Sequence, residues 1–196
     1  MSALPLPELR GVLSPATPLP HLTTNPYSSV TVVNLVFSLP PSSSLPLHPG
    51  GFGYLIPRPV DGYPATKGSG ILGCVFDSSS TTAQDTSGIV KMTVMLGGPY
   101  ISGSVSPPQV DGPTLLSELA EQLGRPLPLP LFVKVHSNTR CIPLYAVGHP
   151  QRMEELKRTL ASEPWNGRME VVGAGVGGVS VGDCVEAGRN VGRKWS

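Results

Sequence analysis

A glycine-rich segment near the end of the chain has the spacing of a nucleotide-binding turn. In GAGVGGVS (173–180), Gly173, Gly175 and Gly178 fit the pattern G-x-G-x-x-G, directly after the apolar run MEVV. In dinucleotide-binding folds such glycines let the backbone approach a pyrophosphate at a helix N-terminus. That fold also needs a second strand with an acidic residue about 20 residues further on, whereas this sequence ends at Ser196. We therefore expect a strand, a glycine turn and one helix rather than a complete Rossmann unit.

Two interpretations of this strand, turn and helix remain open. A helix N-terminus carries unpaired N–H groups and about half a positive charge, which can hold a phosphate or stabilise electron density on a reduced flavin. Alternatively, the glycines only form a tight turn that packs the helix on its neighbours, and spacing alone favours this alternative. Asp183 falls in the first turn of the expected helix, where a carboxylate stabilises the helix dipole.

The composition argues against several other kinds of chemistry. Charged residues make up 14% of the 196-residue chain, and the formal net charge is +1, which argues against nucleic-acid binding because that depends on neutralising phosphates. No apolar run reaches the roughly 18 residues of a membrane span, and the N-terminus lacks the character of a signal or transit peptide. The three cysteines form no C-x-x-C pair and the four histidines no H-x-x-x-H spacing. We therefore expect buried reduced thiols and no metal site.

The order of elements predicts an α+β fold with a mixed or antiparallel sheet and a few helices. Strands are expected where apolar and β-branched runs lie between glycine and proline breakers, at 30–37, 51–57, 71–78, 91–98, 131–137 and 169–173. Helices are expected where apolar residues recur at three- and four-residue spacing, from Pro113 to Leu123, over roughly 149–162 and over about 179–190. Residues 1–29 are expected to form a loop with one short apolar segment.

Six stretches, taken in order, resemble one known family. They are SSVTVVNLVF (28–37), GFGYLIP (51–57), ILGCVFDSS (71–79), TVMLGG (93–98), CIPLYAVGH (141–149) and GVSVGDCVEAGR (178–189). Over nearly the whole chain they resemble the C-terminal part of the protoporphyrinogen oxidases, FAD enzymes of the flavin amine oxidase superfamily. The resemblance implies a partial FAD-linked oxidoreductase fold. It also implies a Pro-rich lead segment at 1–29, a substrate-side sheet with helices at 30–165, and an FAD-closing strand and helix at 166–196.

The resemblance also implies an activity and a location. Family members oxidise protoporphyrinogen IX to protoporphyrin IX in haem biosynthesis. FAD accepts the hydrides, and oxygen reoxidises it with release of hydrogen peroxide. In eukaryotes they associate peripherally with the mitochondrial inner membrane and are often homodimers. GFGYLIP and TVMLGG favour this branch over another flavin amine oxidase such as a polyamine oxidase.

In the closing motif, four residues match family contacts to FAD, namely Ala174, Val179, Ser180 and Val181. The resemblance implies that backbone N–H groups of this loop face the edge of the isoalloxazine ring. Gly182 stands where the family often has Asn, and an early aromatic residue is replaced by Val176. These changes leave the backbone role in place and weaken any role for side chains.

On the sheet, four residues match positions that pack against the tetrapyrrole, namely Phe52, Leu55, Val75 and Met95. Aromatic and aliphatic walls suit a flat, largely apolar macrocycle. Ordinary core packing is the alternative for each of them. We expect no catalytic acid or base in this chain, because hydride transfer to a flavin needs orientation and electrostatics rather than a triad or metal.

Several family features have no counterpart in this sequence. The family is more than twice as long, and both its dinucleotide-binding unit and the arginine that it uses against a substrate carboxylate are missing. From Gly11 to Pro57 there is no Asp, Glu, Lys or Arg, although a solvated surface normally carries charges. We therefore expect a truncated gene product whose isolated chain is colourless and inactive. Two hypotheses follow: the C-terminal portion of an FAD oxidase, or a non-catalytic fragment.

Overall fold

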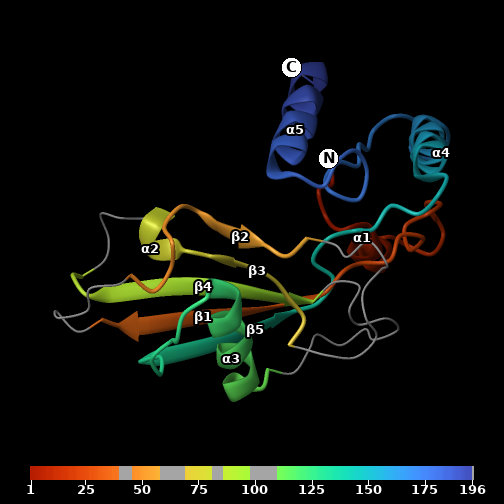
Figure 1. Ribbon diagram of the computed structural model, residues 1–196. Helices are drawn as coiled ribbons and strands as arrows, with labels where there is room; N and C mark the ends of the chain where they lie inside the picture. The colour runs from red at the N-terminus through yellow and green to blue at the C-terminus, as the bar shows by residue number, and fades with distance from the viewer. Residues whose placement is uncertain (40–45, 58–68, 81–85, 98–109, 196) are drawn as a thin grey trace. The chain divides into compact units, whose positions relative to one another are not determined.

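The chain divides into two compact units, each with its own core. The computed structural model describes residues 1–39, 46–57, 69–80, 86–97 and 110–195. The first unit combines Met1–Ser28 with Arg140–Ser196, and the second is Ser29–Thr139 (Figure 1). Residues near both ends of the chain share one apolar cluster, which unites them in the first unit.

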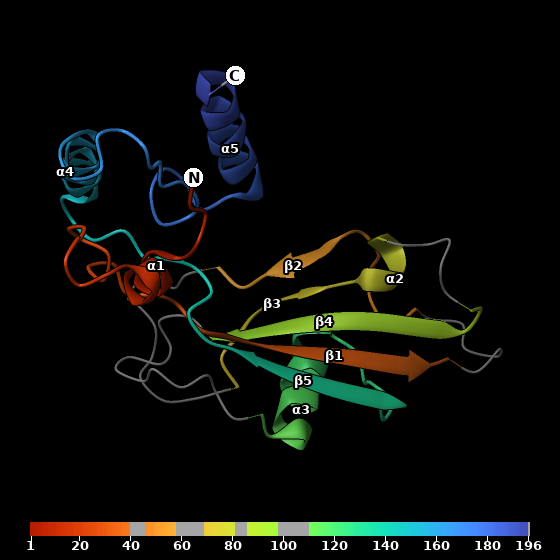
Figure 2. The ribbon, with the colours of Figure 1, turned by 180° about the vertical axis from the view of Figure 1, so that it is seen from behind.

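Within the described residues, the second unit is built on an antiparallel sheet in the order β2-β3-β4-β1-β5 (Figure 2). Its strands are β1 (Val30–Ser38), β2 (Gly53–Leu55), β3 (Ile71–Val75), β4 (Ile89–Gly97) and β5 (Phe132–Asn138), and each neighbouring pair is antiparallel. A short helix, α2 (Asp77–Ser80), follows β3. The α+β class and the five strand predictions for this region are confirmed, and the sheet is antiparallel rather than mixed.

One face of the sheet packs against α3 (Gly112–Leu123), which lies across it in both views (Figure 1, Figure 2). Alternate residues of β1 are buried, among them Val33, Leu35 and Phe37, and they form one cluster with Leu115 and Leu119 of α3. This alternation places one set of side chains of every strand on the α3 face and the other set on the opposite face. We call the opposite face the open face.

The boundaries of α3 follow the predicted signals. Pro113 lies in its first turn, and the carboxylate of Asp111 accepts a hydrogen bond from the Thr114 N–H at 3.2 Å. Gly124 ends the helix in the left-handed conformation with φ 67°, which glycine adopts without steric cost. The predicted helix is confirmed almost to the residue.

The first unit contains α1 (Leu6–Val12), α4 (His149–Ala161) and α5 (Val181–Trp195). Leu6 and Leu9 of α1 are buried in one cluster with Met153 and Leu156 of α4. The prediction of a loop over the first 29 residues is wrong in this part, because prolines at the start of a helix are compatible with it. None of the helices in the described ranges is long and apolar enough to cross a bilayer.

The predicted strand at 169–173 is wrong. Only a single parallel bridge forms there, between Val171 and Ser2, supported by hydrogen bonds from Ser2 N to Glu170 O (2.7 Å) and from Val172 N to Ser2 O (2.9 Å). A strand needs a partner of several residues, and α1 begins at Leu6, shortly after the bridge. Instead of the predicted strand, glycine turn and helix, this part of the chain forms an extended segment, a glycine turn and a helix.

The cysteine prediction is correct in part. None of the three cysteines, all of which lie within the described residues, is in a disulfide; Cys74 is buried, Cys184 half-buried and Cys141 exposed. Burial, with the nearby Asp77 carboxylate adding to it, raises the pKa of the Cys74 thiol to about 12. This thiol is therefore an inert core group.

Leu119→Ala tests the contact between α3 and the sheet. Leu119 is fully buried, and truncating a buried leucine removes contacts and leaves a cavity, at a cost of about 2–5 kcal/mol. We expect that loss in the free energy of urea unfolding, followed by far-UV circular dichroism. Ser117→Ala on the exposed side of the same helix is the control, and equal losses in the two variants would contradict the packing described above.

Candidate functional site

Each glycine of the G-x-G-x-x-G pattern has a steric reason within the first unit. Gly173 has φ 112°, and its carbonyl accepts a hydrogen bond from Val176 N at 3.0 Å. A Cβ on Gly175 would lie 2.9 Å from Cγ of Leu6, and a Cβ on Gly178 would lie 2.5 Å from Cγ of Asp183. The three glycines thus allow a turn, a close contact with α1 and the approach of a capping carboxylate.

Two aromatic side chains bind the backbone of this glycine turn. Tyr145 and His149 are stacked, with ring centroids 3.8 Å apart and 8° between the ring planes. The Tyr145 hydroxyl donates to the carbonyl of Ala174. His149 Nε2 lies 3.1 Å from the carbonyl oxygen of Val176, and its Nδ1 lies 3.2 Å from Asn25 Nδ2. Nε2–H therefore donates to Val176 while Nδ1 accepts from Asn25, so both nitrogens of the imidazole are used.

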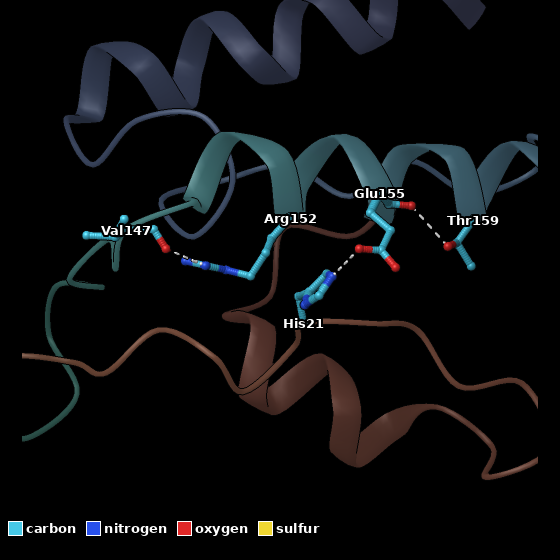
Figure 3. Close-up of polar contacts among 5 residues, drawn as sticks. All are labelled: His21, Val147, Arg152, Glu155 and Thr159. Atoms are coloured by element: carbon cyan, nitrogen blue, oxygen red, sulfur yellow. Dashed lines mark hydrogen bonds and ion pairs between the residues drawn. The ribbon is translucent and has the colours of Figure 1, made fainter.

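The segment that carries Tyr145 and His149 is fixed by α4 (Figure 3). Arg152 donates to the carbonyl of Val147 at 2.7 Å, between the two aromatic residues in sequence. One turn further along α4, Glu155 pairs with His21 at 2.8 Å. These contacts bind α4 to Val147 on one side and to His21 of the N-terminal segment on the other.

The N-terminus of α5 is closed by a reciprocal pair of hydrogen bonds. Ser180 N donates to Asp183 Oδ2 at 3.1 Å, and Asp183 N donates to Ser180 Oγ at 3.0 Å, which is a capping box. The hydrogen bonds from Ser180 lower the pKa of the Asp183 carboxyl. The expectation that Asp183 stabilises the helix start rather than acting as a base agrees with this geometry.

The predicted FAD residues lie together on and after this turn. Ala174 is half-buried, whereas the side chains of Val179 and Val181 are 49% and 81% exposed. The hydroxyl and N–H of Ser180 are used in the cap. The first N–H groups of any helix have no intrahelical acceptor, so the backbone at Val181 and Gly182 offers donors to a ligand. The arrangement provides amides and apolar side chains, not acid–base groups.

Three of the four predicted substrate residues share the open face of the sheet. Gly73 pairs with both Leu55 and Met95. Directly opposite residues in an antiparallel pair project to the same side, as do residues two apart along a strand. Val75, two residues after Gly73 on β3, therefore lies on this face too. Phe52 precedes β2 and is 74% exposed, so the structure does not bring it into the same row.

A chain of polar side chains borders these apolar residues on the open face. Asn34 Nδ2 donates to Thr93 Oγ1 at 2.8 Å, and the Thr93 hydroxyl donates to Asp77 Oδ2 at 2.7 Å. Their partners are thus within the sheet unit. In the described part of the chain, no group of three or more His, Cys, Asp or Glu side chains is placed to hold a metal ion.

Sequence reasoning missed the roles of Tyr145, His149 and Asn25. Their contacts join positions between 27 and 124 residues apart, and no local spacing encodes such contacts. The motif CIPLYAVGH contains both aromatic residues and is the one local signal that points to them.

Structural comparison defines the class of fold. It aligns 98% of the chain with 39% of a protein from an Exiguobacterium species, provisionally assigned as a protoporphyrinogen oxidase, at a TM-score of 0.69 and 21% identity. It also aligns 81% of the chain with 33% of reduced UDP-galactopyranose mutase, at a TM-score of 0.53 and 15% identity. The chain therefore has the fold of one portion of each of these two larger structures.

Sequence comparison finds relatives that match this chain over part of their own length. The chain is 35% identical to the protoporphyrinogen oxidase of Macaca fascicularis, 34% to that of Homo sapiens and 36% to that of Bos taurus. Each alignment covers 96% of this chain and 38% of the relative. No protein-family model matches the chain. Over nearly its whole length, the chain is homologous to one part of protoporphyrinogen oxidase, and it spans about two fifths of the length of these relatives.

Gly175→Ala tests the close contact between the glycine turn and α1. The added methyl group would press against the buried side chain of Leu6, and such overpacking costs about 1–3 kcal/mol. We expect that loss in urea unfolding followed by tryptophan fluorescence, since both tryptophans, Trp165 and Trp195, belong to the first unit. Gly177→Ala is the matched control, because nothing lies within 4 Å of its Cβ position; an equal loss there would refute the steric explanation.

Ser180→Ala tests the capping box at α5. Losing the Ser180 hydroxyl removes one cause of the low pKa of Asp183, so this pKa should rise towards its usual value in an NMR carboxyl titration. Because the folded-state pKa of Asp183 is depressed, its stabilisation exists above the unfolded pKa and disappears as the pH falls through the folded pKa. The variant should therefore show a weaker loss of stability in acid. An unchanged titration would contradict the capping role.

Proposed function

We propose that this chain is the C-terminal portion of an FAD-dependent protoporphyrinogen oxidase, which converts protoporphyrinogen IX to protoporphyrin IX with oxygen as the acceptor. The observation that carries the proposal is the identity of about 35% to protoporphyrinogen oxidases over 96% of the chain. The proposal extends to peripheral attachment to the mitochondrial inner membrane and to a homodimer of the full-length protein.

The glycine turn suits the closing side of a flavin site. The groups assigned to FAD are the backbone at Ala174, Val179, Ser180 and Val181. The exposed valines offer apolar contact to a ring, the first-turn amides offer hydrogen bonds, and the helix N-terminus favours negative charge. The position of Gly177 is open on its Cβ side, so a planar group can approach the backbone there. Bound FAD supplies the hydride-accepting chemistry.

The open face of the sheet suits the substrate side. Leu55 is 74% exposed, and Met95 and Val75 are half-buried next to it in the register. Large apolar side chains left accessible on one face favour a flat apolar ligand. Phe52 is assigned to the same wall from the resemblance and lies before β2. The role of this chain in the reaction is to bind and orient the ring and to exclude water, since none of its residues is assigned as an acid or base.

A non-catalytic role for the isolated chain is the second candidate. It is favoured by the span of only 38% of the relatives' length and by the exposure of Val181, Val185 and Trp195 along α5. A different flavin amine oxidase activity, such as polyamine oxidation, is disfavoured because the curated relatives reported above are protoporphyrinogen oxidases.

A chimera tests the proposal directly. The aligned part of the Homo sapiens protoporphyrinogen oxidase is replaced by this chain, and the purified product is assayed for bound flavin and for oxidation of protoporphyrinogen IX with release of hydrogen peroxide. We expect stoichiometric FAD and turnover in the chimera, and neither in this chain by itself. A folded chimera that binds FAD but oxidises only a polyamine would favour the other branch of the superfamily, and a folded chimera without flavin would end the proposal.

Val181→Asp in the chimera tests the assigned flavin contact. Val181 is 81% exposed at the first position of α5, where an aspartate does not disturb the helix. A carboxylate beside the flavin would repel the negative charge that develops when the flavin is reduced. The variant should therefore contain less FAD, and its flavin should be reduced more slowly. Val12→Asp, at a 69% exposed position, is the control. Equal flavin content in both variants and the parent chimera would remove Val181 from the site.

A further inference from the structure

The register of the sheet places two basic side chains beside the apolar residues of the open face. We call those apolar residues, Leu55, Val75 and Met95, the apolar wall. Along one row, Leu55 and Met95 are followed by Val32 on β1 and His136 on β5, since Met95 pairs with Val32 and Val32 with His136. In the next row, Thr93 pairs with Asn34, and Asn34 pairs with Lys134. Lys134 and His136 therefore project from β5 to the open face, two residues apart.

These two side chains are accessible and close to the wall. All residues of β5 are exposed, and β5 is the last strand of the sheet on this side. Strands lie about 4.8 Å apart, so Lys134 is roughly 5 Å from β1 and about 14 Å from β3 along the sheet. The open face thus changes from apolar side chains on β3 to basic side chains on β5 within about 14 Å. This is about the width of one large ring system that carries short acidic substituents.

The neighbouring acidic group does not neutralise this basic edge. Asp77 lies at the far end of the polar row, and its carboxylate accepts a hydrogen bond from Thr93. Asn34 stands between Thr93 and Lys134, and its amide donates to Thr93. Lys134 is the residue that pairs with Asn34 on β5. Asn34 therefore separates Lys134 from Thr93 and Asp77.

We propose that the open face binds a tetrapyrrole carrying carboxylates, with its ring on Leu55, Val75, Met95 and Val32 and a carboxylate on Lys134 and His136. The choice of a tetrapyrrole rests on the proposed function. What is added is a carboxylate contact on β5, since the substrate contacts taken from the resemblance include no residue of this strand. Lysine donates as a point charge, and imidazole donates from a ring N–H.

Charge complementarity selects this occupant over a second copy of the chain. A partner surface docked on the whole face would have to bury the Lys134 ammonium, which is costly without a paired anion. A small amphipathic dicarboxylate covers the apolar side chains and leaves the ion pair at the exposed edge. Exposed pairs of this kind contribute little individually, so discrimination rather than high affinity is the expected signature.

The test measures binding of protoporphyrin IX and of its uncharged dimethyl ester to the purified chain by fluorescence titration in the same mild detergent. We expect the diacid to bind about fivefold more tightly than the ester. Lys134→Gln should remove most of this preference without changing the affinity for the ester, and Lys134→Arg should preserve it. Circular dichroism confirms folding, which an exposed edge position should not affect.

Lys157→Gln, at an exposed position of α4, is the matched control for loss of one positive charge. The proposal is overturned if the chain binds neither porphyrin, if diacid and ester bind equally, or if Lys157→Gln has the same effect as Lys134→Gln. A flavin-containing active chimera combined with any of these results removes the carboxylate site and leaves the proposed function. Conversely, the chain could prefer the diacid while the chimera is inactive. That result would support the carboxylate site and reject the assignment as an oxidase.

Discussion

The stacked pair of Tyr145 and His149 is the interaction on which the candidate cofactor side depends. One hydroxyl and one imidazole bind successive parts of the same turn through the carbonyls of Ala174 and Val176. Burial, with further contributions from Cys184 and Asp183, raises the pKa of the Tyr145 phenol, so this group remains a hydrogen-bond donor throughout the neutral range. These two contacts hold the backbone of the turn at which we propose that the flavin binds.

The close contacts at the glycines explain why their spacing resembles that of a dinucleotide motif. In a Rossmann unit, the glycines admit a pyrophosphate and a close helix–strand contact. Here Gly175 admits Leu6, and Gly178 admits the carboxylate of Asp183. In both cases another group lies closer to the backbone than a Cβ atom would allow, but the group is a pyrophosphate in one and a protein side chain in the other. The glycine spacing therefore predicts a close approach without identifying the group that makes it.

The sequence was informative wherever a structure is determined locally. β1 has β-branched residues that alternate between faces, and α3 carries both of its end signals, so both were predictable. The segment 169–173 looked equally suited to a strand but finds only Ser2 as a partner, and α1 was hidden by prolines that are acceptable in a first turn. Strand pairing and long-range packing decided these cases, and neither is visible in a local window.

The candidate site shows the same division. The residues predicted to contact FAD came from the resemblance, because nothing in the types of Ala174 or Val179 indicates a ligand. The common face of Leu55, Val75 and Met95 follows from the period of two, but only once the pairing of three strands is known. The basic edge required one further pairing, between β1 and β5, whose registers are set by residues about a hundred positions apart.

The conformation of α5 is determined by short-range contacts, which has a consequence for the cofactor side. Val191 is the only residue of this helix that is buried in the described structure. Its start is fixed by the Ser180–Asp183 box, and its end by the ion pair of Lys194 with Glu170 at 3.2 Å. Packing therefore contributes little to the orientation of its first turn. The amides that we propose to contact the flavin are positioned by hydrogen bonds within the first unit.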